Sequence, residues 1–361
     1  MSLSDTLQIL FWTAFSIAAG TWIVFAYWRL RSNRIRRLEG EAPLRSGREL
    51  IWRDPGSLSA QQMADGPCGR GGGPAEPFHF VEEHDTGSQP CVSVRDRRGR
   101  EWRVKWGQEV HTEVFGTRLA WALGYFAEPS YFIASGVIDG ARELRRAASC
   151  IDDQQRFSEA RFELSESGVA KHFDAHGWAW ADNPFVGSHE LNGLKILMML
   201  VSNWDNKDVR DVARGSNTAI FEYPANGSPS EGGRSIEARY LIIDWGAALG
   251  AWGNNVLKRG RWDPEAFASQ NQYFITGVDD GIVQWGYQGQ RTADLVQGIT
   301  LDDVKWFDRS AQRITDDHLR AALRASGANE EETDRFTAAL RERLNQIHHV
   351  AAQAHAAVPA D

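Results

Sequence analysis

The stretch from Leu191 to Gly246 constrains the fold more than any other part of this 361-residue chain. Near its start, Leu194 and the run Ile196–Val201 are apolar on every side of a helix, and such a helix belongs inside a domain. The helix leads directly into the loop WDNKDVRD, which is dense in carboxylates. Carboxylates at the edge of a core are costly unless they are paired or bind a cation. This segment is therefore predicted to carry a polar site at the edge of the core.

Two predicted strands follow the acidic loop, one over Ser216–Phe221 and one over Leu241–Ile243. The second strand ends in Asp244, which is followed closely by Gly246. An acid that ends an apolar strand just before a glycine is poorly placed for solubility alone. Acidic groups at two neighbouring strand ends would suit a hard cation such as Mg²⁺, which prefers oxygen ligands.

The order of these motifs resembles the active centre of kinase-fold phosphotransferases. Asp205-Asn206-Lys207 is similar to their catalytic-loop Asp-x-Lys, and Asp244-Trp245-Gly246 is similar to their metal-binding Asp-Phe-Gly. The likeness is to the atypical HipA-like and phosphatidylinositol 3-/4-kinase-like enzymes, and it covers about Phe78 to Gly253. The segments NPFVGSHELNGL (Asn183–Leu194) and NWDNKD (Asn203–Asp208) also resemble a bacterial family with an N-W-D-x-K-D motif.

The resemblance implies ATP and Mg²⁺ as cofactors, and it assigns roles to residues of the loop and the strand end. Asp205 would accept the proton of the attacking hydroxyl, and Lys207 would neutralise charge on the transferred phosphoryl group. Asp244 would hold Mg²⁺. Either Asp211 or Asn217 would supply the second metal ligand.

Upstream of this centre, the pattern predicts three short strands and a helix. The strands are expected over Phe78–Glu83, Cys91–Asp96 and Glu101–Trp106, and the helix over Gln108–Leu123. The charged stretch Ala141–Ser167 is expected to be helical or irregular.

Lys105 lies in the middle of the third strand, between apolar residues, and needs a counter-charge there. By the kinase resemblance its partner is Glu113 on the following helix, in a pair that orients the α- and β-phosphates. Gly87 and Ser88 lie where a kinase places its phosphate-covering loop, and their N–H groups would face the nucleotide. The alternatives are an ordinary hairpin at Gly87 and Ser88, and a surface lysine on an edge strand.

The N-terminus contains 22 residues without a charge, Leu7–Trp28, enough for a helix to cross the ~30 Å hydrocarbon layer. Five arginines follow between Arg29 and Arg37, and only Asp5 precedes the run, so the positive-inside bias places the rest of the chain in the cytoplasm. The prediction is a single-pass protein of the inner (cytoplasmic) membrane that contacts the lipid bilayer through this helix. A cleaved signal peptide and a buried soluble helix are the alternatives.

Composition excludes several classes of function. The net charge of −8 offers no basic surface for nucleic acid. The three cysteines have no C-x-x-C spacing, which argues against a zinc site or a disulfide framework. A hydrophobic content of 42%, with 15 tryptophans, is sufficient for a sizeable core.

The predicted fold is α+β, with an N-terminal transmembrane helix followed by a two-lobed protein-kinase-like domain. The predicted parts are 1–28 (tail and transmembrane helix), 29–77 (basic and Gly/Pro-rich linker), 78–134 (small β-rich lobe with one helix), 135–350 (large, mainly helical lobe with the catalytic-loop hairpin) and 351–361 (frayed tail). The predicted function is transfer of phosphate from ATP/Mg²⁺ to a hydroxyl of a protein or small molecule at the cytoplasmic membrane face.

Three other functions stay open at this level. Typical kinases carry Asn five residues after the catalytic base, and Arg210 in that position favours a pseudokinase that binds nucleotide or acts as a scaffold. A kinase-like fold can also serve other nucleotide chemistry, such as adenylyl transfer. In a purely structural membrane protein, Lys105, Asp205 and Asp244 would lie too far apart to share one phosphate–metal site.

Overall fold

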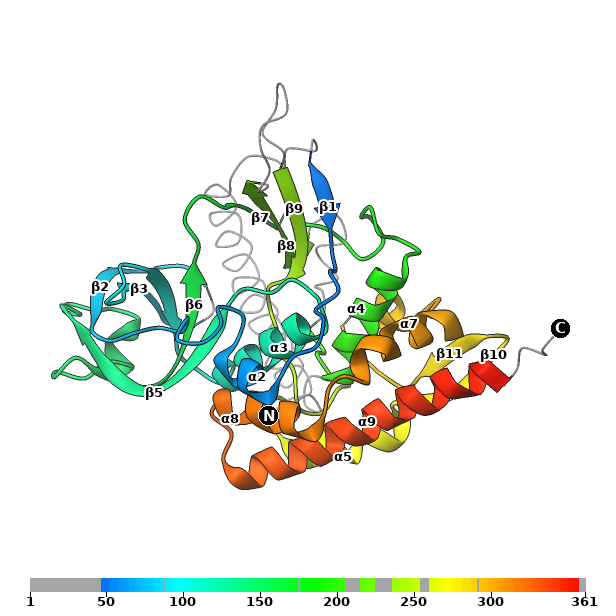
Figure 1. Cartoon of the computed structure of the whole chain (residues 1–361). Helices are drawn as coiled ribbons and strands as arrows, with labels where there is room; N and C mark the ends of the chain where they lie inside the picture. Colours follow the sequence, from blue (N-terminus) through cyan, green and yellow to red (C-terminus); the bar gives the residue numbers. More distant parts are fainter. Residues whose placement is uncertain are drawn as a thin grey trace, which may run out of the picture. The chain divides into compact units, whose positions relative to one another are not determined.

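A closed barrel of five strands makes up the first half of the domain (Figure 1). The computed structural model describes residues 47–87, 89–174, 176–205, 215–224, 236–253, 260–290 and 292–356. The barrel strands follow the order β2-β3-β4-β6-β5. They are β2 (Phe78–Glu83), β3 (Cys91–Arg95), β4 (Glu101–Lys105), β5 (Ser130–Asp139) and β6 (Arg156–Ser165).

The interior of the barrel explains why these segments are strands. Val92, Val94, Trp102, Val104 and Phe162 are fully buried there, and β-branched and aromatic residues pack well on a pleated surface. The three strands predicted between residues 78 and 106 are confirmed.

The second half of the barrel differs from the prediction. The expected lobe boundary at residue 134 falls within β5, and β6 lies in the stretch that we expected to be helical or irregular. That stretch did not show a strand pattern because β6 buries charged residues, Arg161 and Glu163, beside apolar ones.

Helix α3 (Val110–Ala122) follows β4, as predicted, and is buried along most of its length. Its Arg118 is buried and donates hydrogen bonds to the carbonyl oxygens of Met63 (2.8 Å) and Ala64 (2.9 Å) in α2 (Ala60–Asp65). Strand β1 (Arg48–Leu50) pairs in parallel with β9 (Ile236–Ile242). Part of the predicted 29–77 linker is therefore folded into the domain.

The second half of the domain combines a four-stranded sheet, in the order β1-β9-β8-β7, with helices. Its elements are β7 (Ala170–Asp174), α4 (His189–Leu200), β8 (Gly215–Pro224), α5 (Pro264–Ser269), β10 (Ile275–Asp279), β11 (Ile282–Trp285), α6 (Thr292–Val296), α7 (Leu301–Ala311), α8 (Asp316–Ala325) and α9 (Glu330–Ala356). Short 3₁₀ turns occur at Ala147–Ser149 and Asn271–Tyr273. Helix α9 continues past residue 350, where we expected the folded chain to end.

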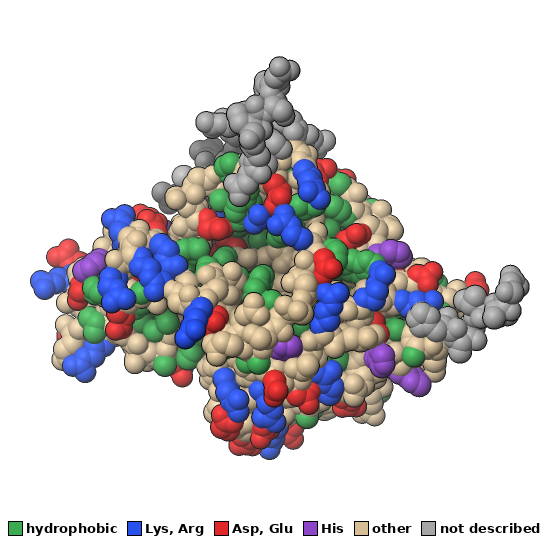
Figure 2. All heavy atoms as spheres, viewed as in Figure 1, with side chains coloured by type: hydrophobic (Ala, Val, Ile, Leu, Met, Phe, Trp, Pro, Cys, Tyr) green, Lys and Arg blue, Asp and Glu red, His purple; other side chains and the backbone are tan. Residues whose placement is uncertain are grey.

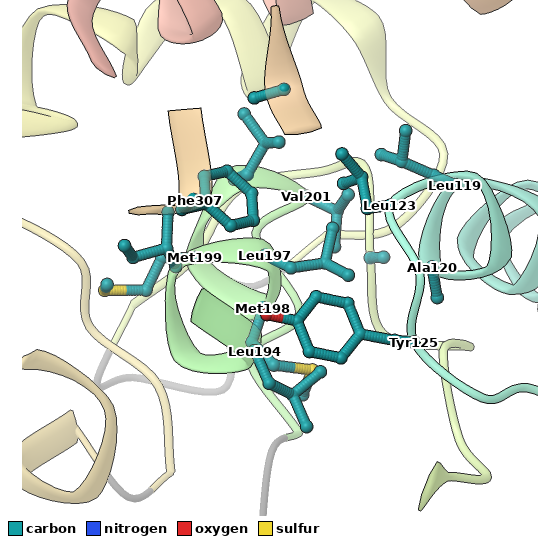
Figure 3. Packing of buried hydrophobic residues seen from close by; sticks show 14 of the residues in the cluster. Leu119, Ala120, Leu123, Tyr125, Leu194, Leu197, Met198, Met199, Val201 and Phe307 are labelled. Atoms are coloured by element: carbon teal, nitrogen blue, oxygen red, sulfur yellow. The ribbon is translucent and has the colours of Figure 1, made fainter. Parts of the chain in front are cut away.

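Helix α4 is the buried helix that the sequence predicts. Leu194 and Ile196–Val201 are all at most 1% exposed. Figure 3 shows Leu194 and Leu197 facing residues at the end of α3, with Phe307 of α7 nearby. The helix therefore ends inside the core and delivers the following loop to a fixed place.

The predicted membrane span Leu7–Trp28 lies outside the described residues. Among the helices of the described part of the chain, none is both long and apolar enough to cross a membrane.

Candidate functional site

A cavity of about 230 Å³ gathers most of the predicted site residues. Five of them line it: Gly87, Lys105, Glu113, Asn217 and Asp244. The remaining lining residues are Thr86, Gln89, Cys91, Arg103, Trp106, Glu109, Val110, Arg161 and Ile243. The barrel, α3 and the ends of β8 and β9 thus meet at one cavity.

Four predicted residues need separate mention. Asp205 does not line the cavity, but its carbonyl oxygen accepts a hydrogen bond of 2.6 Å from Nδ2 of Asn217, which does. Ser88, Lys207 and Asp211 lie outside the described residues, so their roles stay predictions.

The prediction that Lys105 forms an ion pair with Glu113 is wrong. Nζ of Lys105 lies 3.7 Å from Oε2 of Glu163. Glu113 instead pairs with Arg161 at 2.7 Å, and the same guanidinium contacts Glu163 at 2.9 Å. The reason is the register of the barrel, in which Arg161 of β6 lies directly opposite Lys105 of β4. The result is the chain Lys105–Glu163–Arg161–Glu113, called below the barrel charge network.

Burial gives the acids of this network different proton affinities. Burial raises the pKa of Glu113 to about 8; Arg161 opposes that rise, and the nearby Asp244 adds to it. Burial also acts to raise the pKa of Glu163, but Lys105, Arg161 and Arg103 together hold it below its usual range. Glu163 is therefore the fixed anion of the network, and Glu113 is the acid whose charge can change.

Helix α3 packs directly on the turn that carries Asp244. A Cβ on Gly116 would lie 2.6 Å from Cβ of Trp245, and one on Gly246 would lie 2.7 Å from Cγ of Glu109. Oγ1 of Thr112 also donates a hydrogen bond of 3.0 Å to the carbonyl oxygen of Gly246. Only glycine permits both close approaches, so the position of α3 and that of Asp244 are linked.

Asp244 is oriented by neutral donors. Its Oδ1 accepts a hydrogen bond of 3.0 Å from the backbone N–H of Gly246. Its carbonyl oxygen accepts another, of 2.9 Å, from Nδ2 of the buried Asn203. Asn203 belongs to the loop that follows α4, so this loop and the end of β9 are held side by side.

Asn217 joins the two parts of this region. Its backbone is left-handed, with φ of +60°, a conformation that asparagine tolerates better than most residues. Its carbonyl oxygen accepts from the N–H of Ile243 at 3.1 Å, and its Nδ2 donates to Asp205. The side chain therefore lies between Asp205 and the strand end that carries Asp244.

The carboxylate of Asp205 is half-buried and has a specific donor. Its Oδ1 accepts a hydrogen bond of 2.6 Å from Nε2 of Gln290, a residue far away in sequence. Asp205, Asn217 and Asp244 form what is called below the loop side of the site, in which carboxylates are held by amides and backbone groups.

The described oxygen donors at the cavity fit a metal ion that is also held by phosphate. No group of three or more His, Cys, Asp or Glu side chains that could hold a metal ion occurs among the described residues. Asp244 and Asn217 provide two oxygen donors at the cavity. Mg²⁺ is usually bound by one or two carboxylates with phosphate oxygens and water, and these residues fit that pattern.

Sequence reasoning missed Arg161, Glu163 and Gln290. Arg161 and Glu163 are two residues apart, so they lie on the same face of a strand, and their opposite charges were the available signal. Gln290 gives no local signal, because its partner is 85 residues away along the chain.

Comparison with known proteins gives a limited result. No protein-family model matches the chain, and no curated protein matches it. Among solved structures, the Golgi casein kinase with Mn/ADP bound matches with 13% identity and a TM-score of 0.36, over 77% of this chain and 72% of that chain. The Rio2 kinase-ADP/Mg²⁺-phosphoaspartate complex from Chaetomium thermophilum matches with 14% identity and a TM-score of 0.29, over 74% and 72%.

A second crystal structure of the Golgi casein kinase matches with 11% identity and a TM-score of 0.36, over 79% of this chain and 74% of that chain. These solved structures are kinases, but the identities and TM-scores are low. The chemistry of the site is therefore inferred from the residues of this chain.

Proposed function

We propose that this protein is a phosphotransferase that moves the terminal phosphate of ATP, bound with Mg²⁺, to a hydroxyl of a protein or small molecule. One observation carries the proposal: Lys105, Asn217 and Asp244 line the same cavity, and Asp205 is hydrogen-bonded to Asn217. A cation, two oxygen donors and a carboxylate are the groups that phosphoryl transfer requires around a nucleotide.

The barrel charge network and Gly87, together called the barrel side of the site, bind the phosphates in this proposal. Lys105 and Arg103 both line the cavity, with side chains 30% and 40% exposed and contacts with Glu163 of 3.7 and 3.9 Å. We assign the phosphates to Lys105, because the kinase resemblance places a strand lysine there. Arg161 is buried between two carboxylates and instead holds Glu163 and Glu113 in place. Gly87 lines the cavity, where a loop that covers phosphates is expected.

The loop side carries the metal and the acceptor. Asp244 and the side-chain oxygen of Asn217 would hold Mg²⁺, which supplies charge neutralisation to the phosphates when it is bound. Asp205 takes the proton of the acceptor hydroxyl as that oxygen bonds to the γ-phosphorus and the bond from phosphorus to ADP breaks. The predicted role of Lys207, to neutralise charge on the transferred group, completes the proposal.

The membrane location is also part of the proposal and is supported by the sequence of Leu7–Trp28 alone. On the face in Figure 2, basic and acidic side chains are interspersed. With 48 acidic and 40 basic residues in the chain, this agrees with a protein or small-molecule acceptor better than with nucleic acid.

The test is autophosphorylation with γ-labelled ATP and Mg²⁺, comparing the wild type with Asp205→Ala and Asp244→Ala. Asp205→Ala should lower the rate about 10²- to 10⁴-fold, as expected for loss of a general base. Asp244→Ala should abolish transfer and weaken Mg²⁺-dependent nucleotide binding. The matched control is Asp153→Ala, since Asp153 is an exposed aspartate in the turn before β6, and it should react like the wild type.

The same samples separate the rival function. A rise in melting temperature with ATP and Mg²⁺ but without transfer would favour the pseudokinase that Arg210 suggests. If ATP and Mg²⁺ produce neither a shift in melting temperature nor phosphate transfer, both nucleotide functions are contradicted. Mass spectrometry of the product would reveal adenylyl transfer, because AMP and phosphate add different masses.

A further inference from the structure

One short segment, Tyr287–Gln290, contacts three successive residues of the loop that carries Asp205. The hydroxyl of Tyr287 donates to the carbonyl oxygen of Asn203. The N–H of Gln290 donates to the carbonyl oxygen of Trp204 at 2.9 Å, and its Nε2 donates to Oδ1 of Asp205 at 2.6 Å. We call this segment the 287–290 strap.

The strap is itself fixed in place. Tyr287 is 1% exposed, and its ring centroid lies 5.7 Å from that of Trp252. A Cβ on Gly289 would collide with the hydroxyl of Tyr287, so only glycine lets the chain fold back here. The N–H of Gly289 is bonded to Oγ1 of Thr292 at 3.1 Å, which ties the strap to α6. The donor that reaches Asp205 is therefore attached to a rigid support.

The backbone that precedes Asp205 is held by a residue of another element. Arg343 of α9 is fully buried and donates to the carbonyl oxygen of Leu200 at 3.0 Å and to Oγ of Ser202 at 2.7 Å. These contacts fix the backbone before Asp205 and do not involve its carboxylate. The Gln290 amide, by contrast, bonds directly to the carboxylate of Asp205.

We propose that Gln290 is a positioning residue that orients the carboxylate of Asp205 toward the acceptor hydroxyl. This inference rests on the proposed function. A neutral amide suits the task, because it fixes a carboxylate oxygen and adds no positive charge of its own that would lower the affinity of that carboxylate for the proton. Misplacement of a reacting group by about 1 Å can cost about 100-fold in rate.

The experiment measures kcat and the KM for ATP in wild-type protein, Gln290→Met and Gln290→Glu. Gln290→Met keeps the length of the side chain and removes its donor, so kcat should fall about 10- to 100-fold while the KM for ATP stays within about twofold. Gln290→Glu keeps the shape but places a second carboxylate against Asp205, and its kcat should fall further. Gln284→Met is the matched control, because Gln284 is exposed on β11 and donates only weakly, at 3.3 Å, to its neighbour Ile282.

The outcomes separate this inference from the function on which it rests. Gln290 variants that transfer phosphate at the wild-type kcat overturn the positioning role while the proposed function stands. A change in the KM for ATP alone, or an equal loss in Gln284→Met, also overturns it. If the wild type transfers no phosphate, the failure is that of the proposed function, and this role of Gln290 falls with it. Melting temperatures of all four proteins identify any variant that is poorly folded. If Gln290→Met does not fold, the kcat of Gln290→Glu decides the question.

Discussion

The two sides of the cavity hold their functional groups by different physics. On the barrel side, the carboxyl groups of Glu113 and Glu163 share the guanidinium of Arg161 at 2.7 and 2.9 Å, and cations hold Glu163 as an anion. On the loop side, Asp205 and Asp244 accept hydrogen bonds from the Gln290 amide and the Gly246 N–H. A network of charges can exchange partners when a phosphate enters, whereas neutral hydrogen bonds set a geometry in advance.

The same difference predicts how substitutions on each side should affect stability and catalysis. Removing one member of a buried ion pair leaves an uncompensated charge, which costs about 3–5 kcal/mol. Removing a neutral hydrogen bond costs about 1 kcal/mol, or somewhat more if a buried partner is left unsatisfied. Substitutions on the barrel side should therefore act first on stability, and those on the loop side first on catalysis.

The largest effect is expected from Arg161→Met. This variant leaves Glu113 and Glu163 buried without the cation that they share, and the free energy of unfolding should fall by about 3–5 kcal/mol. Urea unfolding measures the loss. Arg156→Met is the control, because Arg156 begins the same strand but is exposed. Equal unfolding midpoints for the two variants would show that the barrel charge network is not what stabilises this side.

A smaller effect is expected from substitutions of Asn217. Two of them separate the role of its backbone conformation from its proposed role as a metal ligand. Asn217→Ala loses the hydrogen bond to Asp205 and places an alanine at φ of +60°, whereas Asn217→Gly loses the same bond without the strain. The alanine variant should therefore be less stable than the glycine variant by about 1 kcal/mol.

Phosphoryl transfer should behave differently from stability in these two variants. Both lack the side-chain oxygen proposed for Mg²⁺, so both should lose transfer to the same extent. Thermal unfolding and the labelled-ATP assay measure the two effects. Full transfer by Asn217→Gly would show that Asn217 serves the backbone and not the metal.

The sequence predicted the loop side better than the barrel side, for a physical reason. Asp205 and Asp244 each follow an apolar element within a few residues, and the apolar runs of α4 and of the strand before Asp244 locate them. Lys105 and Asp244 line one cavity, whereas Asp205, which was expected to join them there, is not among its lining residues. The partner of Lys105 could not be predicted, because it depends on the register between β4 and β6, and β6 lacks a clear strand pattern.

The long-range contacts were also beyond the sequence. Gln290 and Arg343 reach the Asp205 loop across 85 and more than 140 residues, and neither carries a local signal for its partner. Such contacts depend on how segments far apart in the sequence pack against each other in the folded chain.

The smallest effect is a pH dependence of nucleotide affinity that only the barrel side should show. Burial raises the pKa of Glu113 to about 8, against Arg161 and with help from Asp244. Below that pH the side chain is neutral, and Arg161 is balanced chiefly by Glu163. Above it, Glu113 gains a negative charge that repels phosphate. The dissociation constant of MgATP should therefore increase, by about threefold, from about pH 7 to about pH 9.

Glu113→Gln should remove this dependence, because glutamine is fixed in the neutral state that resembles protonated Glu113. Isothermal titration calorimetry of both proteins across the pH range measures it. Glu101→Gln, at the exposed start of β4, is the control, and its affinity should change with pH as the wild type does. The same increase in Glu113→Gln as in the wild type would locate the titrating group elsewhere. A pH-independent wild type would mean that Arg161 keeps Glu113 ionised throughout, and the two sides of the cavity would then differ in geometry but not in their response to protons.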